Sequence, residues 1–274
     1  MKSSRRIFGF LVICFTLFSL SAPLSAQTQE PMFEFKLGQE IFYFSVGGLL
    51  GLPGLIQKKT ALTSAEISAL DRNNVNSFDR GATYNWSSSA RHASDALVIT
   101  SMMTPLVLLA GERPRKEFLG ILLLYAESVA LVFGVTQFVK TTVDRTRPYM
   151  YNPDVPMSTK LEWKADDSRK SFFSSHTAFA FNGAVFLSTV FTMYYPKSTL
   201  NFIVWPASLT AASLVGYFRY KAGMHYRSDV LVGAGIGALI GFLVPFLHKK
   251  TENTNISILP STGEFNGLVV RFGI

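Results

Sequence analysis

Three polar clusters interrupt an otherwise apolar chain, and each holds residues suited to phosphate binding or proton transfer. In the last cluster, Arg219 offers a planar guanidinium fork that matches a phosphate. His225 and Asp229 are four residues apart, so on a helix their side chains share one face. A carboxylate beside an imidazole holds one tautomer and prepares the other ring nitrogen for nucleophilic or acid–base work. The alternative is a polar loop at a membrane edge.

The first cluster supplies two further cations. Lys140 and Arg147 are seven residues apart, about two helical turns, and Pro148 ends the helix after them. Two cations on one face can grip a phosphate, although interfacial side chains reaching toward water give the same pattern.

The middle cluster precedes an apolar run. Ser174 or Ser175 suits an N-cap, which would leave the first helical amides pointing at an anion. His176 is then placed to donate a proton to a leaving oxygen. The alternative is a capping loop with an incidental histidine.

The elements that position these clusters are predicted to be membrane-spanning helices. Hydrophobic residues make up 48% of the 274 residues and charged residues 16%, against about a quarter in soluble domains. The predicted fold is an all-α polytopic membrane bundle of five or six spans. Leu37–Ile56 is rich in glycine and holds Pro53, which favours a short or non-crossing segment. The five stronger spans are Ala96–Ala110, Phe118–Val139, Thr177–Tyr195, Leu200–Tyr217 and Val230–Leu247.

The predicted domain organisation has four parts. Residues 1–26 read as a signal peptide or an uncleaved anchor, and hold Cys14, the single cysteine. Residues 27–95 form an extension with an amphipathic helix that Thr63 and Glu66 cap. Residues 96–248 are the membrane domain, and 249–274 a tail with a strand-like end after Asn266-Gly267.

Charge asymmetry predicts the orientation. The basic turn 111–117 and Lys249–Lys250 belong in the cytoplasm, which places all three clusters at the outer membrane–water interface. The net charge of +8 therefore points to lipid head groups and topology, and no nucleic-acid partner is expected. Glu127 is interpreted as a hydrogen-bonded structural residue, and His248 as a solvated cytoplasmic end.

Taken together, the three clusters resemble the three-part signature of the type 2 phosphatidic acid phosphatase superfamily. The parts are Lys140-x6-Arg147-Pro148, then Ser174-Ser175-His176, then Arg219-x5-His225-x3-Asp229. The resemblance covers about Ala96 to Leu247. Phe173 and Ser175 stand where the family usually has proline and glycine, and Phe218 stands for its serine.

The resemblance implies a role for each position. His225 would attack phosphorus and form a phosphohistidine, Asp229 would orient it, and His176 would protonate the leaving group. The phosphate-binding residues would be Lys140, Arg147, Ser174, Ser175 and Arg219. It implies no metal site and no cofactor, in keeping with the few carboxylates near the histidines in sequence.

The function so implied is a metal-independent lipid phosphate phosphatase of the bilayer. Its substrate would be a phosphomonoester or pyrophosphate of an envelope lipid: a lipid A phosphate, undecaprenyl diphosphate, phosphatidylglycerol phosphate or phosphatidic acid. The predicted location is a bacterial inner membrane, with the site facing the periplasm. The alternatives are a lipid phosphotransferase using the same site, and a non-catalytic transporter or lipid-binding protein.

Overall fold

The structure, a computed structural model, describes residues 30–57, 59–163, 165–250, 256–261 and 267–272. The expected signal peptide or anchor over residues 1–26 lies outside these ranges. Residues 32–274 form one compact unit, and the site lies within it.

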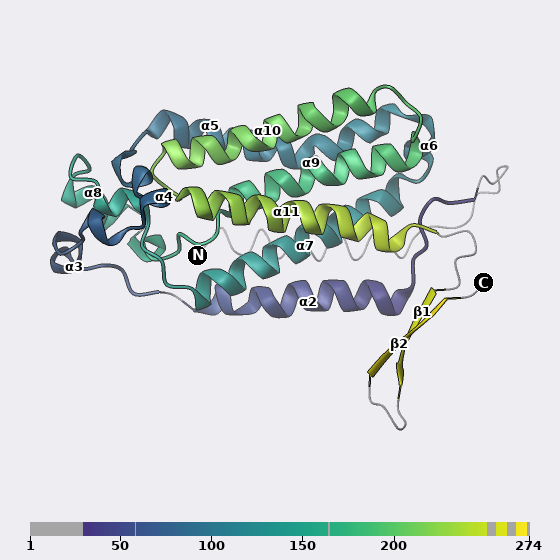
Figure 1. Cartoon of the computed structure of the whole chain (residues 1–274), viewed down its shortest axis with the longest axis horizontal. Helices are drawn as coiled ribbons and strands as arrows, with labels where there is room; N and C mark the ends of the chain where they lie inside the picture. The colour runs from purple at the N-terminus through teal and green to yellow at the C-terminus, as the bar shows by residue number, and fades with distance from the viewer. Residues whose placement is uncertain (1–29, 58, 164, 251–255, 262–266, 273–274) are drawn as a thin grey trace. The chain divides into compact units, whose positions relative to one another are not determined.

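Long helices side by side make up this unit (Figure 1). They are α2 (Leu37–Ile56), α5 (Ser88–Met103), α7 (Phe118–Thr142), α9 (Ser175–Tyr194), α10 (Asn201–Lys221) and α11 (Arg227–His248). Among the described residues, α2, α5 with its continuation η4 (Thr104–Ala110), α7, α9 and α11 are long and apolar enough to cross a bilayer. Helix α10 is as long but less apolar. The predicted helical membrane bundle is confirmed.

Helix α9 is the core of the bundle. It packs against α5, α7, α10 and α11, and 72% of an apolar 18-residue stretch within it is buried. Small residues let its neighbours approach closely: a Cβ on Gly237 of α11 would lie 2.0 Å from the Ala178 carbonyl oxygen. The N-terminus of α9, which carries the middle cluster, is therefore held on several sides.

Short elements connect the long helices. They are α3 (Ser64–Ser68), η2 (Arg72–Asn74), α4 (Ser77–Arg80), η3 (Gly81–Tyr84), α6 (Glu112–Lys116), η5 (Pro148–Tyr151), α8 (Met157–Glu162) and η6 (Ala165–Asp167). The predicted capping box is confirmed, because the Thr63 amide donates to the Glu66 carboxylate and the Glu66 amide to the Thr63 hydroxyl. In the tail, β1 (Ile256–Ser261) pairs antiparallel with β2 (Gly267–Phe272).

Helix α2 coincides with the predicted apolar run Leu37–Ile56, but it is longer than the short helix that its glycines and Pro53 suggested. It runs without a break for 20 residues, with Pro53 inside it. Its glycines serve packing rather than chain breaks: a Cβ on Gly47 would lie 2.8 Å from the Ala130 carbonyl oxygen of α7. Near its start, α2 places Glu40 beside Glu127 of α7, and after both helices end Lys59 Nζ donates to the Val143 carbonyl at 2.6 Å. The two helices are therefore parallel neighbours.

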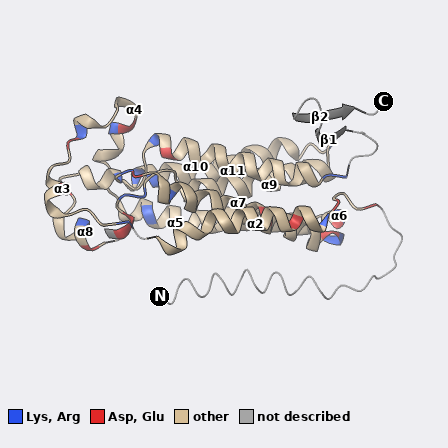
Figure 2. Ribbon diagram, turned by 90° about the horizontal axis from the view of Figure 1, so that it is seen from below, with Lys and Arg blue, Asp and Glu red and all other residues tan. Residues whose placement is uncertain are grey.

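Charged residues are sparse along the middle of the helices and gather at their two ends, with many of them at the end that holds α3, α4 and α8 (Figure 2). A hydrophobic cluster lies beneath this polar end. It joins the extension (Leu62, Ile67, Ala90) to the loops after α7 (Tyr149, Met150, Val155) and after α10 (Ala222, Met224). Residues N-terminal to the predicted membrane domain thus form part of the scaffold around the site.

Candidate active site

All eight residues expected in the site come from helix ends and loops at this polar end. Lys140 lies in the last turn of α7, and Arg147 in the loop that follows. Ser174, Ser175 and His176 begin α9. Arg219 lies in the last turn of α10, while His225 and Asp229 lead into α11. These segments bring the cations and the imidazoles to the same end of the helical bundle.

His225 is buried, with 1% of its surface exposed. Its Nε2 lies 3.2 Å from Nη1 of Arg147, and its Nδ1 lies 2.7 Å from the carbonyl oxygen of Ser171. A guanidinium only donates, and a carbonyl only accepts. The two contacts therefore assign the proton to Nδ1 and leave a lone pair on Nε2.

The surroundings of His225 disfavour its charged form. Burial lowers the pKa of His225 well below its ordinary 6.5, and the cations of Arg147, Lys140 and Arg219 lower it further. The imidazole is therefore neutral at physiological pH, which is the state in which Nε2 can act as a nucleophile.

Asp229 is fully buried and acts on His225 through the intervening backbone. Its Oδ2 accepts from Ser171 Oγ at 2.6 Å and from the Tyr226 amide at 2.9 Å. The same oxygen lies 3.6 Å from His225 Nδ1, beyond hydrogen-bond distance. Asp229 thus holds the segment whose carbonyl accepts the imidazole proton, rather than accepting that proton itself.

Arg145 joins this arrangement to the extension. Its Nη1 donates to Asp229 Oδ1, and its Nη2 lies 2.7 Å from Asp79 Oδ2. Burial of Asp79 opposes its ionisation, but hydrogen bonds from Ser228, Asn76 and Arg145 outweigh it and lower the pKa of Asp79. An ionised carboxylate of the extension therefore holds the cation that faces Asp229.

His176 and Arg219 converge on one carboxylate. Asp95 Oδ1 lies 2.9 Å from Nε2 of His176 and 3.0 Å from Nη1 of Arg219. His176 is partly exposed, with 29% of its side chain accessible, whereas Arg219 is 3% exposed. The imidazole of His176, which was expected to protonate a leaving group, can therefore be reached from solvent, whereas the guanidinium of Arg219 is buried.

The other expected phosphate ligands are also held in place. Lys140 Nζ donates to the Lys170 carbonyl at 2.9 Å. Arg147 Nη2 lies 2.6 Å from Asp167 Oδ2. Ser174 is the N-cap of α9, since its hydroxyl accepts from the Thr177 amide at 3.4 Å. Ser175 is the first residue of α9, where backbone amides point out of the helix.

Sequence reasoning missed several of these partners. The sequence predicted no contact between the expected site residues and Asp95, Asp79, Ser171 or Asp167. The one available signal was Arg145, a third cation within the first polar cluster. Nothing local to the sequence pairs it with a carboxylate 66 positions away.

At the other end of the helices, the prediction of a solvated His248 is wrong. Its side chain is 1% exposed and packs beside the rings of Phe35 and Tyr43. The hydrogen bond expected at Glu127 is also not seen among the described residues, because neither of its carboxylate oxygens has a hydrogen-bond partner there.

Comparisons with known proteins cover the part of the chain that holds the three polar clusters. Residues 121–252 match the model of the PAP2 superfamily. The Schizosaccharomyces pombe protein named probable diacylglycerol pyrophosphate phosphatase 1 is 35% identical over 111 residues, which are 38% of this chain. That match spans 39% of the relative's own length.

A solved structure is also similar: the first transmembrane PAP2-type phosphatidylglycerolphosphate phosphatase, from Bacillus subtilis. The likeness covers 77% of this chain and 96% of that one, at 22% identity and a TM-score of 0.42. The family model spans all three polar clusters, from Lys140 to Asp229. Residues 121–252, just under half of the chain, are therefore similar in sequence to the PAP2 superfamily.

Proposed function

We propose that this protein is a membrane-bound lipid phosphatase that works through a phosphohistidine. The observation that carries the proposal is the buried, neutral His225, whose Nε2 lone pair faces Nη1 of Arg147 at 3.2 Å. A phosphate drawn to that guanidinium would bring its phosphorus to the nucleophilic nitrogen. The match of residues 121–252 to the PAP2 superfamily model and the name of the yeast relative support a lipid phosphatase activity.

The first step forms a bond from His225 Nε2 to phosphorus and breaks the bond from phosphorus to the leaving oxygen. His176 gives its proton to that oxygen, and the lipid alcohol or lipid monophosphate departs. In the second step His176 accepts a proton from water, the water oxygen attacks phosphorus, and the P–N bond breaks. Inorganic phosphate leaves, and both imidazoles return to their starting states.

Cations and amides would stabilise the transferring group. Phosphoryl transfer places negative charge on three equatorial oxygens, so catalysis depends on positioned positive charge. Arg147, Arg219 and Lys140 provide three such groups, and the amide of Ser175 adds the dipole of the α9 N-terminus. All three cations are more than nine-tenths buried, which strengthens their attraction for an entering phosphate.

The proposed substrate is an envelope lipid with a terminal phosphomonoester or diphosphate. An open pocket of about 550 Å³ lies between the start of α5 and the end of α10, and one of its lining residues, Phe218, precedes Arg219 in the chain. Trp86, Ala90, Ala93, Tyr217 and Phe218 line it together with polar groups. Such a mixed lining suits the junction between a head group and its acyl or prenyl chains.

The experiment is phosphate release from detergent-solubilised lipids in the presence of EDTA. The panel would contain phosphatidic acid, phosphatidylglycerol phosphate, undecaprenyl diphosphate and a lipid A phosphate. We expect release from at least one lipid by the wild type, and a loss of roughly 1000-fold or more in His225→Ala. His92→Ala, which removes an exposed histidine, is the matched control. Equal release by wild type and His225→Ala would refute the mechanism.

We further propose that the protein lies in a bacterial inner membrane with the site facing the periplasm. The basic residues of α6 precede α7, which ends at the site, and Lys249–Lys250 follow α11, which begins there. Both basic groups therefore lie at the opposite end of the helices from the site, which favours that orientation. In a Cys14→Ser background, an impermeant thiol reagent should label Asp154→Cys on cells with a permeabilised outer membrane. It should label Thr199→Cys only after the inner membrane is opened. The reverse pattern would overturn the orientation.

A further inference from the structure

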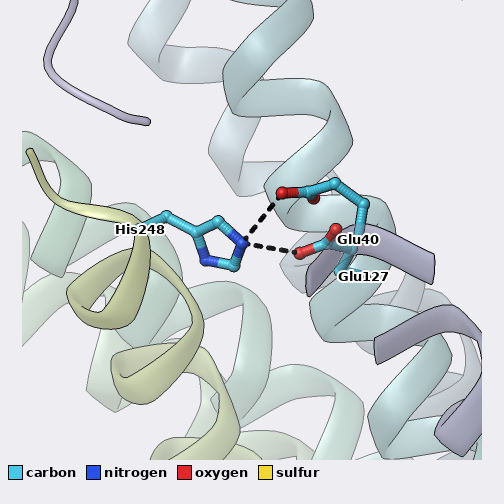
Figure 3. Close-up of side chains that lie close together, drawn as sticks. All are labelled: Glu40, Glu127 and His248. Carbon is cyan, nitrogen blue, oxygen red and sulfur yellow. Dashed lines mark ion pairs between the residues drawn. The ribbon is translucent and has the colours of Figure 1, made fainter. Parts of the chain in front are cut away.

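A second polar cluster lies far from the phosphate site. Glu40 of α2, Glu127 of α7 and His248 of α11 are 8%, 0% and 1% exposed. Figure 3 shows the imidazole of His248 directed at both carboxylates. Glu127 precedes Lys140 by 13 positions on α7, or about 20 Å along the helix. The proposed phosphatase chemistry makes no use of these residues.

The hydrogen bonds around the cluster leave its inner atoms without partners. Nδ1 of His248 lies 2.8 Å from the Val244 carbonyl oxygen, so Nδ1 carries a proton, and in the neutral imidazole Nε2 then presents a lone pair. Nε2 of His248 and both carboxylate oxygens of Glu127 have no hydrogen-bond partner. Oε2 of Glu40 has none either, while Oε1 accepts from the Lys36 amide at 3.2 Å. Buried polar atoms of this kind normally have a partner.

The distances between these atoms match a shared cation better than direct hydrogen bonds. His248 Nε2 lies 3.5 Å from Glu40 Oε1 and 3.5 Å from Glu127 Oε2. A charge-assisted N–H···O bond is about 2.7–2.9 Å long. Two donors that each bind a tetrahedral zinc ion at about 2.0–2.2 Å lie about 3.3–3.6 Å apart. One donor atom from each residue falls within 4.8 Å of the others, so one ion can reach all three.

We propose that Glu40, Glu127 and His248 bind one divalent transition-metal ion, with zinc as the best fit. Two carboxylates and a neutral imidazole carry a charge of −2, which a divalent ion cancels inside an apolar bundle. An imidazole ligand and a small donor set favour zinc over magnesium or calcium. Either carboxylate can supply a fourth donor by binding through both oxygens. The Val244 carbonyl and the Lys36 amide orient two of the ligands.

The proposed ion has a structural role. It joins α2 to α7 and α11, and α2 lies outside the segment that matches the PAP2 model. The proposal is independent of the phosphatase chemistry, since none of the three ligands belongs to the candidate active site. The competing occupant is a proton shared by the two carboxylates, which would also reduce the buried charge.

The test measures zinc bound to the full-length protein in detergent. Protein treated with a chelator, then with zinc and then desalted, should retain about one zinc per chain by mass spectrometry, and zinc should raise its thermal midpoint. Glu127→Gln and His248→Gln should bind zinc about 100-fold more weakly and lose the thermal response. Glu34→Gln and His92→Gln, which change exposed residues of the same types, should behave as the wild type.

Two measurements guard against a misfolded variant. Glu40→Gln changes the most accessible ligand at the start of α2, and it should lose zinc while keeping a monodisperse elution profile. Cobalt in place of zinc should give the visible absorption of a tetrahedral site in the wild type but not in Glu127→Gln. Absence of retained zinc in the wild type, or retention unchanged in Glu127→Gln, would overturn the proposal and favour the shared proton.

Discussion

Nη1 of Arg147 lies 3.2 Å from Nε2 of His225, and this contact decides which tautomer the imidazole adopts. The guanidinium has no acceptor to offer, so Nε2 keeps its lone pair and Nδ1 donates to the Ser171 carbonyl. The guanidinium of Arg147 therefore disfavours protonation of His225 at Nε2. In the proposed mechanism, His225 is therefore in its nucleophilic state before any substrate arrives.

The first prediction concerns the protonation of His225. Because burial and the nearby cations lower its pKa, the Nε2 resonance should remain that of a neutral imidazole as pH falls through 6.5. The measurement is a ¹⁵N histidine titration, with His225→Asn identifying the signal. Its contribution to stability should be present above pH 6.5 and should be lost as pH falls toward the lowered pKa. A midpoint at or above 6.5 would contradict the assignment.

The second prediction concerns Asp95, which joins His176 to Arg219. Asp95→Asn should lower kcat by about 10- to 100-fold, because His176 loses the carboxylate that stabilises its charged form. The loss should shrink for p-nitrophenyl phosphate, whose leaving group needs no proton. A merely structural role would give the same loss with both substrates. Asp154→Asn, an exposed acid at the same end, is the control and should leave both rates unchanged.

The third prediction concerns Arg145, which lies between Asp79 and Asp229. Arg145→Met should destabilise the folded protein by about 3–5 kcal/mol, because two buried carboxylates lose their shared cation. Thermal unfolding in detergent measures the effect. Arg169→Met removes ion pairs to Glu66 and Asp144, whose side chains are 46% and 56% exposed, and should cost less than about 1 kcal/mol. Similar losses in both variants would show that burial does not decide the outcome.

The fourth prediction uses two adjacent glycines of α2. A Cβ on Gly47 would lie 2.8 Å from the Ala130 carbonyl oxygen of α7, whereas a Cβ on Gly48 meets nothing within 4 Å. Gly47→Ala should therefore destabilise the protein by about 1–3 kcal/mol through overpacking. Gly48→Ala should stabilise it by about 0.5–1 kcal/mol, since alanine favours a helix interior. Equal midpoints for the two variants would contradict the close packing of α2 on α7.

Much of the candidate site was predictable because its residues lie within short segments. His225 and Asp229 share one segment, and Ser174 to His176 another, so local spacing reports their proximity. Asp95 and His176 are 81 positions apart, and no periodicity connects them. Contacts of that kind depend on how the helices pack, which the sequence expresses only through scattered small residues.

In the fold, too, local patterns were predictable from the sequence, whereas contacts between distant residues were not. The apolar runs predicted a helical bundle, because about 20 apolar residues are what a bilayer requires. The glycines of α2 were misread, because a glycine that weakens a helix in water also permits close approach to a neighbouring backbone. Only the position of α7 beside Gly47 and Gly51 distinguishes the two effects.

The parallel pairing of α2 with α7 also sets an order of assembly. Gly47 and Gly134 touch across 87 positions of sequence. At a synthesis rate of about 5–20 residues per second, α2 waits roughly 4–17 s for its partner to emerge from the ribosome. During that interval the side of α2 that carries Gly47 and Glu40 faces lipid or the insertion machinery instead of α7. Slower synthesis of the residues between α2 and α7 therefore lengthens the time during which α2 can pack against a helix other than α7.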